Sequence, residues 1–200
     1  MPVRQGVPAR SAFCNFPFDA DYRPLYLALM ASLVCTGQTP RSVLEIPPSA
    51  DRLERILHLL EQCAFSLHDL SRVQLSARGL PRFNMPFELG LAAALAGRKS
   101  ARHQFRLLEA RPNRVQRSLS DLNGYEAFIH GGRPTGIFAA VCDIFTSFRP
   151  FPVGDRRGFR RVYQELTAFA LQEYGRASLY TPDRFSRVVL AATTLVQRHS

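Results

Sequence analysis

Apolar and polar residues alternate in blocks along the first three quarters of the chain. Short apolar runs bounded by turn-forming residues predict five strands, at 11–18, 42–46, 64–70, 103–109 and 125–129. Between them lie segments with apolar residues every three or four positions, which predict helices at 21–35, 51–63, 85–96 and 135–148. Strands that alternate with helices favour right-handed crossovers. We therefore expect an α/β domain in which helices cover both faces of a parallel sheet of about five strands.

The pattern changes at both ends of this domain. Residues 1–10 are polar and contain two prolines, which predicts a flexible N-terminus. The segment 149–155, RPFPVGD, is typical of a linker. Two further amphipathic helices are expected at 156–174 and 182–198. The sequence thus predicts an α/β domain at 11–148 and a helical extension at 156–200, which we expect to bury apolar surface against the sheet domain or a second subunit.

One helix has an unusual composition. Residues 85–96 are apolar on every side, as in a helix buried within a domain, and only Glu88 carries a charge. A buried carboxylate must be paired, solvated through a pocket, or used, because burying it alone is costly. Asn84 as N-cap would place Glu88 in the first turn, where the helix dipole favours its ionised form. Alternatively, Glu88 only caps its own helix.

Polar residues follow several of the predicted strands. In open parallel sheets, ligands bind beyond the carboxyl ends of the strands. Those ends carry 15–19, Glu45, 69–72 and 111–114. Within 15–19, Phe16 and Phe18 could form an aromatic wall against a flat ligand, or be core residues at a strand end. The arginines could receive a diphosphate, or be solvated surface.

Composition narrows the possible partners. The net charge is +10, and Lys99 is the single lysine, so the basic character comes from arginine. Such a surface permits phosphate or nucleic-acid binding, but no helix-turn-helix, zinc-finger or RNA-binding signature occurs, so we do not expect nucleic acid. No apolar run is long enough to span a bilayer and no signal peptide opens the chain, so we expect a cytoplasmic protein without a membrane partner.

The sequence lacks the motifs of several common kinds of functional site. The four cysteines (14, 35, 63 and 142) are widely separated and predict buried free thiols, not a metal site. Neither GxGxxG nor GxxxxGK[ST] occurs. His130-Gly131-Gly132 is similar to oxyanion-hole loops, but GxSxG is absent, so we do not expect a serine hydrolase.

Three segments together resemble a known family. The pattern FxxxPFD-xxYxPL at 13–25, HDLSR at 68–72 and RFNMPFELGLA at 82–92 resemble a bacterial group of TIR-like proteins, which share the Toll/interleukin receptor fold. The resemblance covers about 13–148 and includes QRSLSDLNG at 116–124. FELG after an Asp-ending strand also looks like the related nucleoside deoxyribosyltransferases. The resemblance implies a flavodoxin-like arrangement of the sheet.

The resemblance also implies site residues. In both relatives a helix-borne glutamate works at the anomeric carbon of a ribose, which here implies Glu88. Asp69 would orient a sugar hydroxyl or base. The residues implied to line the ligand pocket are Asn15, Phe16, Pro17, Phe18, Ser71, Arg72, Arg82 and Asn84. The deoxyribosyltransferases usually have Gly-Ser/Thr before their glutamate, whereas 84–87 here is Asn-Met-Pro-Phe.

The expected function follows from this resemblance. We expect a TIR-like N-glycosidase that acts on NAD or a related nucleotide as a substrate, with no resident cofactor, in a bacterial defence or toxin system. We also expect a homo-oligomer, as TIR domains assemble with one another. TIR domains of the adaptor kind lack catalysis, so a nucleotide-signal-binding or self-assembling module is a second possibility. Base transfer between deoxynucleosides is a third.

Overall fold

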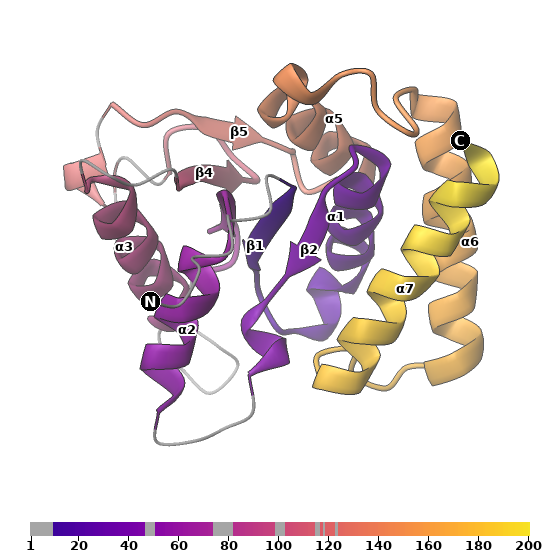
Figure 1. Cartoon of the computed structure of the whole chain (residues 1–200), viewed down its shortest axis with the longest axis horizontal. Helices are drawn as coiled ribbons and strands as arrows, with labels where there is room; N and C mark the ends of the chain where they lie inside the picture. The colour runs from indigo at the N-terminus through magenta and orange to yellow at the C-terminus, as the bar shows by residue number, and fades with distance from the viewer. Residues whose placement is uncertain are drawn as a thin grey trace, which may run out of the picture.

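The computed structural model describes residues 10–46, 51–73, 82–98, 103–114, 117, 119–122 and 124–200. Five parallel strands form one sheet in the order β2-β1-β3-β4-β5 (Figure 1). The strands are β1 (Ser11–Asn15), β2 (Thr39–Arg41), β3 (Phe65–Asp69), β4 (Gln104–Glu109) and β5 (Ala127–Ile129). This confirms the expected parallel α/β sheet, and its strand order is the flavodoxin-like one.

Helices cover both faces of the sheet (Figure 1). On one face lie α2 (Arg52–Glu61) and α3 (Asn84–Ala96), and on the other lie α1 (Arg23–Cys35) and α5 (Pro134–Ile144). Each face has its own apolar core, because side chains of a strand alternate between the two sides. In β1, for example, Phe13 belongs to the α2/α3 core, whereas Ala12 and Cys14 belong to the α1/α5 core.

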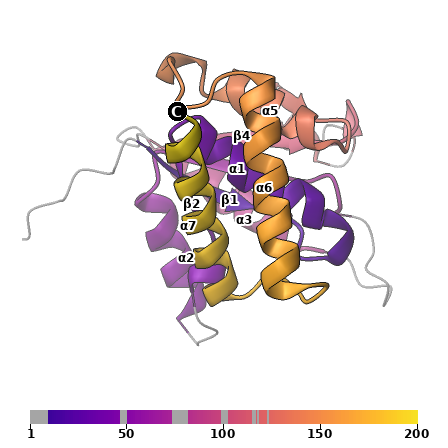
Figure 2. The same cartoon turned by 90° about the vertical axis from the view of Figure 1, so that its right-hand side faces the viewer.

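The last two helices extend the α1/α5 core. Helices α6 (Arg156–Tyr174) and α7 (Pro182–His199) lie outside α1, on the side away from the sheet (Figures 1 and 2). Their buried residues recur every three or four positions, as the amphipathic pattern predicted: Phe159, Val162, Leu166 and Ala170 on α6, and Phe185, Val188, Ala192, Leu195 and Val196 on α7. The expectation that these helices bury apolar surface against the sheet domain is confirmed.

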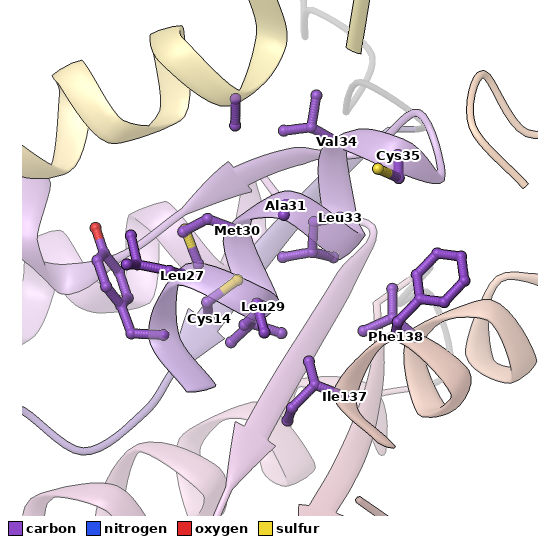
Figure 3. Close-up of a cluster of buried hydrophobic side chains, with 14 of the residues drawn as sticks. Cys14, Leu27, Leu29, Met30, Ala31, Leu33, Val34, Cys35, Ile137 and Phe138 are labelled. Atoms are coloured by element: carbon purple, nitrogen blue, oxygen red, sulfur yellow. The ribbon is translucent and has the colours of Figure 1, made fainter. Parts of the chain in front are cut away.

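Helix α1 is enclosed between the sheet and α6/α7. Eleven of its 13 residues are buried. Its side chains pack against the sheet and α5 as well as against α6 and α7. Leu29 and Leu33 lie near Ile137 and Phe138 of α5 in Figure 3. A helix covered all round has no polar face, which is why its sequence lacks a strong amphipathic pattern. None of the helices in the described ranges is long and apolar enough to cross a membrane.

The second predicted strand is wrong in its position. Strand β2 is Thr39–Arg41, and Val43–Glu45 forms a 3₁₀ turn instead of the expected strand at 42–46. The Ser42 side chain accepts a hydrogen bond from the amide of Leu44, and the Glu45 carboxylate accepts one from the amide of Ser42 at 2.8 Å. This capping box stabilises a helical turn, which overrides the apolar pattern.

Smaller differences occur at the ends of elements. The expected helix at 135–148 ends at Ile144 and continues as a 3₁₀ turn at Thr146–Phe148. Short 3₁₀ turns also occur at Ala20–Tyr22 and Ser120–Leu122. All four cysteines are free and buried, as expected. Burial raises the pKa of the Cys35 and Cys63 thiols to about 12, so neither is a thiolate at neutral pH.

Candidate functional site

The chain reverses its winding direction at β1 and β3. Helix α1 follows β1 onto one face of the sheet, whereas α3 follows β3 onto the other. In open α/β sheets, ligands bind at such switch points, beyond the carboxyl ends of the two strands. Contacts within the structure join the segments after β1 and β3 to the start of α3 at this point, and these segments carry most of the predicted site residues.

Asn15 joins the end of β1 to α3. Its side-chain amide donates to the Met85 carbonyl at 2.9 Å and lies 3.1 Å from His68 Nδ1. Burial lowers the pKa of His68 to about 3, so its imidazole is neutral. The amide therefore donates to an unprotonated Nδ1, and Nε2 donates to Ser66 Oγ at 2.9 Å. Both amide hydrogens of Asn15 are thus used within the protein.

Asp69 lies in a closed network at the end of β3. Its side chain has no exposed surface, and it accepts hydrogen bonds from the Tyr22 hydroxyl and, at 2.8 Å, from the Ser71 amide. His130 Nε2 lies 3.3 Å away, and His130 Nδ1 accepts from the Gly132 amide. Burial opposes ionisation of Asp69, but His130, Ser71 and Tyr22 outweigh it and hold its pKa below the usual value. Asp69 therefore positions Tyr22 and the Ser71 turn.

Two arginines expected to bind ligand pair with carboxylates of the chain. Asp19 Oδ2 accepts hydrogen bonds from Arg82 and, at 3.0 Å, from Arg72 Nε, and Arg72 also reaches Asp21 at 3.0 Å. Burial opposes ionisation of Asp19, but both arginines stabilise the charged form and lower its pKa. These ion pairs join the segments after β1 and β3 to the segment before α3.

The aromatic segment after β1 meets the C-terminal extension. Phe16 and Pro17 are buried, and Phe16 packs against Tyr22 and Tyr26, so it is a core residue. Phe18 is 44% exposed and stacks on Tyr180, with ring centroids 5.3 Å apart. The Tyr180 hydroxyl donates to the Asp19 carbonyl at 2.7 Å. Sequence reasoning missed Tyr180, because it lies 161 residues away in a segment with no site motif.

Glu88 lies deeper in α3 than the sequence predicted. The helix begins at Asn84 with Phe83 at the N-cap, so Asn84 is not the cap, and the first turn contains no acidic residue. Both expectations based on the first turn, capping and ionisation by the helix dipole, are therefore wrong. Burial instead raises the Glu88 pKa to about 7, against a weaker opposing effect of Arg52. Its Oε2 atom is buried without a hydrogen-bond partner in the described ranges.

A pocket of about 390 Å³ opens at the same edge of the sheet. The loops after β3, β4 and β5 and the start of α1 line it, and its polar lining includes Asp21, Ser71, Arg72, Arg111 and Arg114. Glu88 does not belong to this lining. From the sequence, we expected the arginines and Glu88 to line one site. This pocket is lined by Arg72, Arg111 and Arg114 but not by Glu88.

Within the described ranges, no three His, Cys, Asp or Glu side chains lie close enough together to hold a metal ion. No model of a known protein family, no curated protein and no solved structure matches the chain.

Proposed function

We propose that this chain binds a nucleotide at the β1/β3 switch point and cleaves its N-glycosidic bond with Glu88. The observation that carries the proposal is the buried Glu88 carboxylate, whose Oε2 atom has no hydrogen-bond partner among the described residues. Glu88 is 8% exposed. Proteins rarely retain such a group for stability, because a polar atom that loses its water without a replacement costs roughly 1–3 kcal/mol or more. A strongly shifted carboxylate is a common mark of a catalytic position.

Cleavage of an N-glycosidic bond can be catalysed by a single carboxylate. Cleavage of an N-glycosidic bond passes through a sugar cation, and an ionised carboxylate next to the anomeric carbon stabilises that charge or captures it covalently. With a pKa of about 7, Glu88 is ionised in a substantial fraction of molecules at neutral pH. NAD is the best substrate class for this arrangement, because nicotinamide leaves as a neutral base from a cationic precursor and needs no general acid.

Release of nicotinamide from NAD by purified protein tests this proposal. Glu88→Gln removes the charge and keeps the shape, so turnover should fall by roughly a hundredfold or more. Glu61→Gln is the matched control, because Glu61 is a half-exposed helical glutamate that pairs with Arg98 at 3.6 Å. The control should turn over like wild type. If wild type cleaves NAD and Glu88→Gln cleaves it nearly as fast, Glu88 is not the catalytic residue.

A pH profile separates NAD cleavage from base transfer. Cleavage of NAD needs the ionised carboxylate, so the rate should rise with pH through about 7. Transfer of a neutral nucleobase needs a proton donor, so a reaction that uses the protonated form of Glu88 should slow over the same range.

The ion pairs between Asp19 and the two arginines favour a second candidate, a non-catalytic module that binds a nucleotide signal. Arg72 and Arg82 already hold the segments around the switch point together, so a phosphate that replaced Asp19 would rearrange them. If the purified protein hydrolyses no nucleotide, but one nucleotide raises its melting temperature, the protein has this second function.

A further inference from the structure

The pocket beyond β3, β4 and β5 has a separate chemistry from that of Glu88. Three arginines, Arg72, Arg111 and Arg114, line it together with one carboxylate, Asp21. Its volume of about 390 Å³ lies within the range of about 300–1,000 Å³ in which proteins bind small molecules. The side chains of Leu25 and Pro24 add an apolar wall to this basic pocket.

Arg111 has no ion-pair partner among the described residues. Arg72 pairs with Asp19 and Asp21, and Arg114 pairs with the buried Glu109 at 2.9 Å. Arg111 is exposed. The described ranges contain all 16 acidic residues of the chain, so no side-chain carboxylate elsewhere in the sequence could pair with it.

Ser71 provides a second, independent observation. It lines the pocket, and only 6% of its surface is exposed. Its amide donates to Asp69, but its hydroxyl oxygen is buried and has no hydrogen-bond partner in the part of the chain that the structure describes. Buried hydroxyls nearly always have a partner, so this one is available to a group that binds in the pocket. A hydroxyl can donate to an anionic oxygen.

We propose that this pocket binds the diphosphate group of a small molecule, with Arg111 as its main charge contact and Ser71 Oγ as a hydrogen-bond donor. Guanidinium groups form strong, directional hydrogen bonds with phosphate oxygens. Asp21 is a competing anion, because it pairs with Arg72 at 3.0 Å. Its side chain is 79% exposed and can move away when the phosphate arrives. The site does not require Glu88 to cleave any substrate.

Calorimetric titration of the full chain with pyrophosphate, ADP and adenosine tests the site. Pyrophosphate and ADP should bind, more weakly at high salt, and adenosine should not. Equal affinities for pyrophosphate and ADP would identify the inorganic ion as sufficient, whereas tighter binding of ADP would identify a nucleotide that also contacts the wall at Leu25. Failure of both phosphates to bind would overturn the proposal.

Three variants locate the binding. Arg111→Gln should weaken it tenfold or more, and Asp21→Asn should strengthen it several-fold because a competing carboxylate is lost. Arg160→Gln on the exposed side of α6 removes the same charge elsewhere and should change the affinity less than twofold. If Arg111→Gln and Arg160→Gln weaken binding equally, the effect is one of net charge and the pocket is not the site. Pyrophosphate has no glycosidic bond, so its binding is measured independently of any glycosidase activity, and a failed glycosidase assay would leave this result standing.

Discussion

The side-chain amide of Asn15 donates a hydrogen bond to the main-chain carbonyl of Met85, 2.9 Å away. This bond joins the end of β1 to the first turn of α3, across 70 residues of sequence. The same amide contacts the neutral His68 at 3.1 Å. Asn15 therefore fixes where α3 begins relative to the sheet, and with it the position of Glu88 one turn further along.

Replacement of Asn15 tests that connection. Asn15→Leu keeps the size of the side chain but leaves the Met85 carbonyl and His68 Nδ1 without their donor. Each lost partner in a buried site costs roughly 1–3 kcal/mol, so we expect the free energy of unfolding to fall by about 3 kcal/mol. Urea denaturation measures this change. Gln164→Leu, on the exposed side of α6, is the control and should stay within about 0.5 kcal/mol of wild type.

The raised pKa of Glu88 predicts a pH-dependent cost to stability. The folded state binds this proton more tightly than the unfolded state, whose carboxyl titrates near 4.5, so ionisation disfavours folding. The contribution of Glu88 is therefore most favourable below pH 4.5 and is lost as the pH rises to about 7. At about 1.4 kcal/mol per pH unit, the loss is roughly 3 kcal/mol.

Glu88→Gln should remove that dependence. We expect the variant to resemble wild type near pH 4.5 and to be more stable than wild type by roughly 2–3 kcal/mol at pH 8. Urea unfolding at several pH values provides the measurement, with Glu61→Gln as the exposed control. A constant difference between wild type and Glu88→Gln across this range would show that Glu88 is solvated and ordinary.

Two leucines of α6 test how the C-terminal helices are joined to the rest of the protein. Leu166 is fully buried in the core that α1 and α5 share, and Leu171 on the same helix is 61% exposed. Leu166→Ala should cost about 2–5 kcal/mol, and Leu171→Ala less than about 0.5 kcal/mol. Because the core is continuous, the loss should appear in one cooperative transition. Two separate transitions in calorimetry would contradict this.

Alanine substitutions at two glycines, one crowded and one open, provide a further comparison. A Cβ at Gly136 would lie 1.9 Å from the carbonyl oxygen of His130, whereas a Cβ at Gly90 would meet no atom within 4 Å. Gly136→Ala should therefore displace the start of α5, disturb the His130–Asp69 contact and lower stability by several kcal/mol. Gly90→Ala, in the middle of α3, should raise it by about 0.5–1 kcal/mol. Thermal unfolding compares the two, and equal effects would exclude the steric explanation.

Local patterns in the sequence determined which segments are strands and helices. The predicted helix at 156–174 matches α6 at both ends, because its buried face repeats every three or four residues and Asp155 caps it through the amides of Arg157 and Gly158. The alternation of strands with helices likewise determined that the sheet is parallel, because each helix connects two strands as a crossover. At 42–46 a capping box of only four residues outweighed the apolar pattern, so that strand was misplaced.

Only the tertiary structure decided the environment of each candidate side chain. The sequence identified Glu88 as the lone charge of an apolar helix, but its raised pKa comes from burial, which depends on the elements that pack against α3. Arg72 looked available for a ligand, and the fold paired it with Asp19, 53 residues away. Tyr180 reached Phe18 because α6 and α7 pack back onto α1. Periodicity shows which face of an element is buried, but not which distant residues cover it, and those neighbours set the charge and exposure of a site.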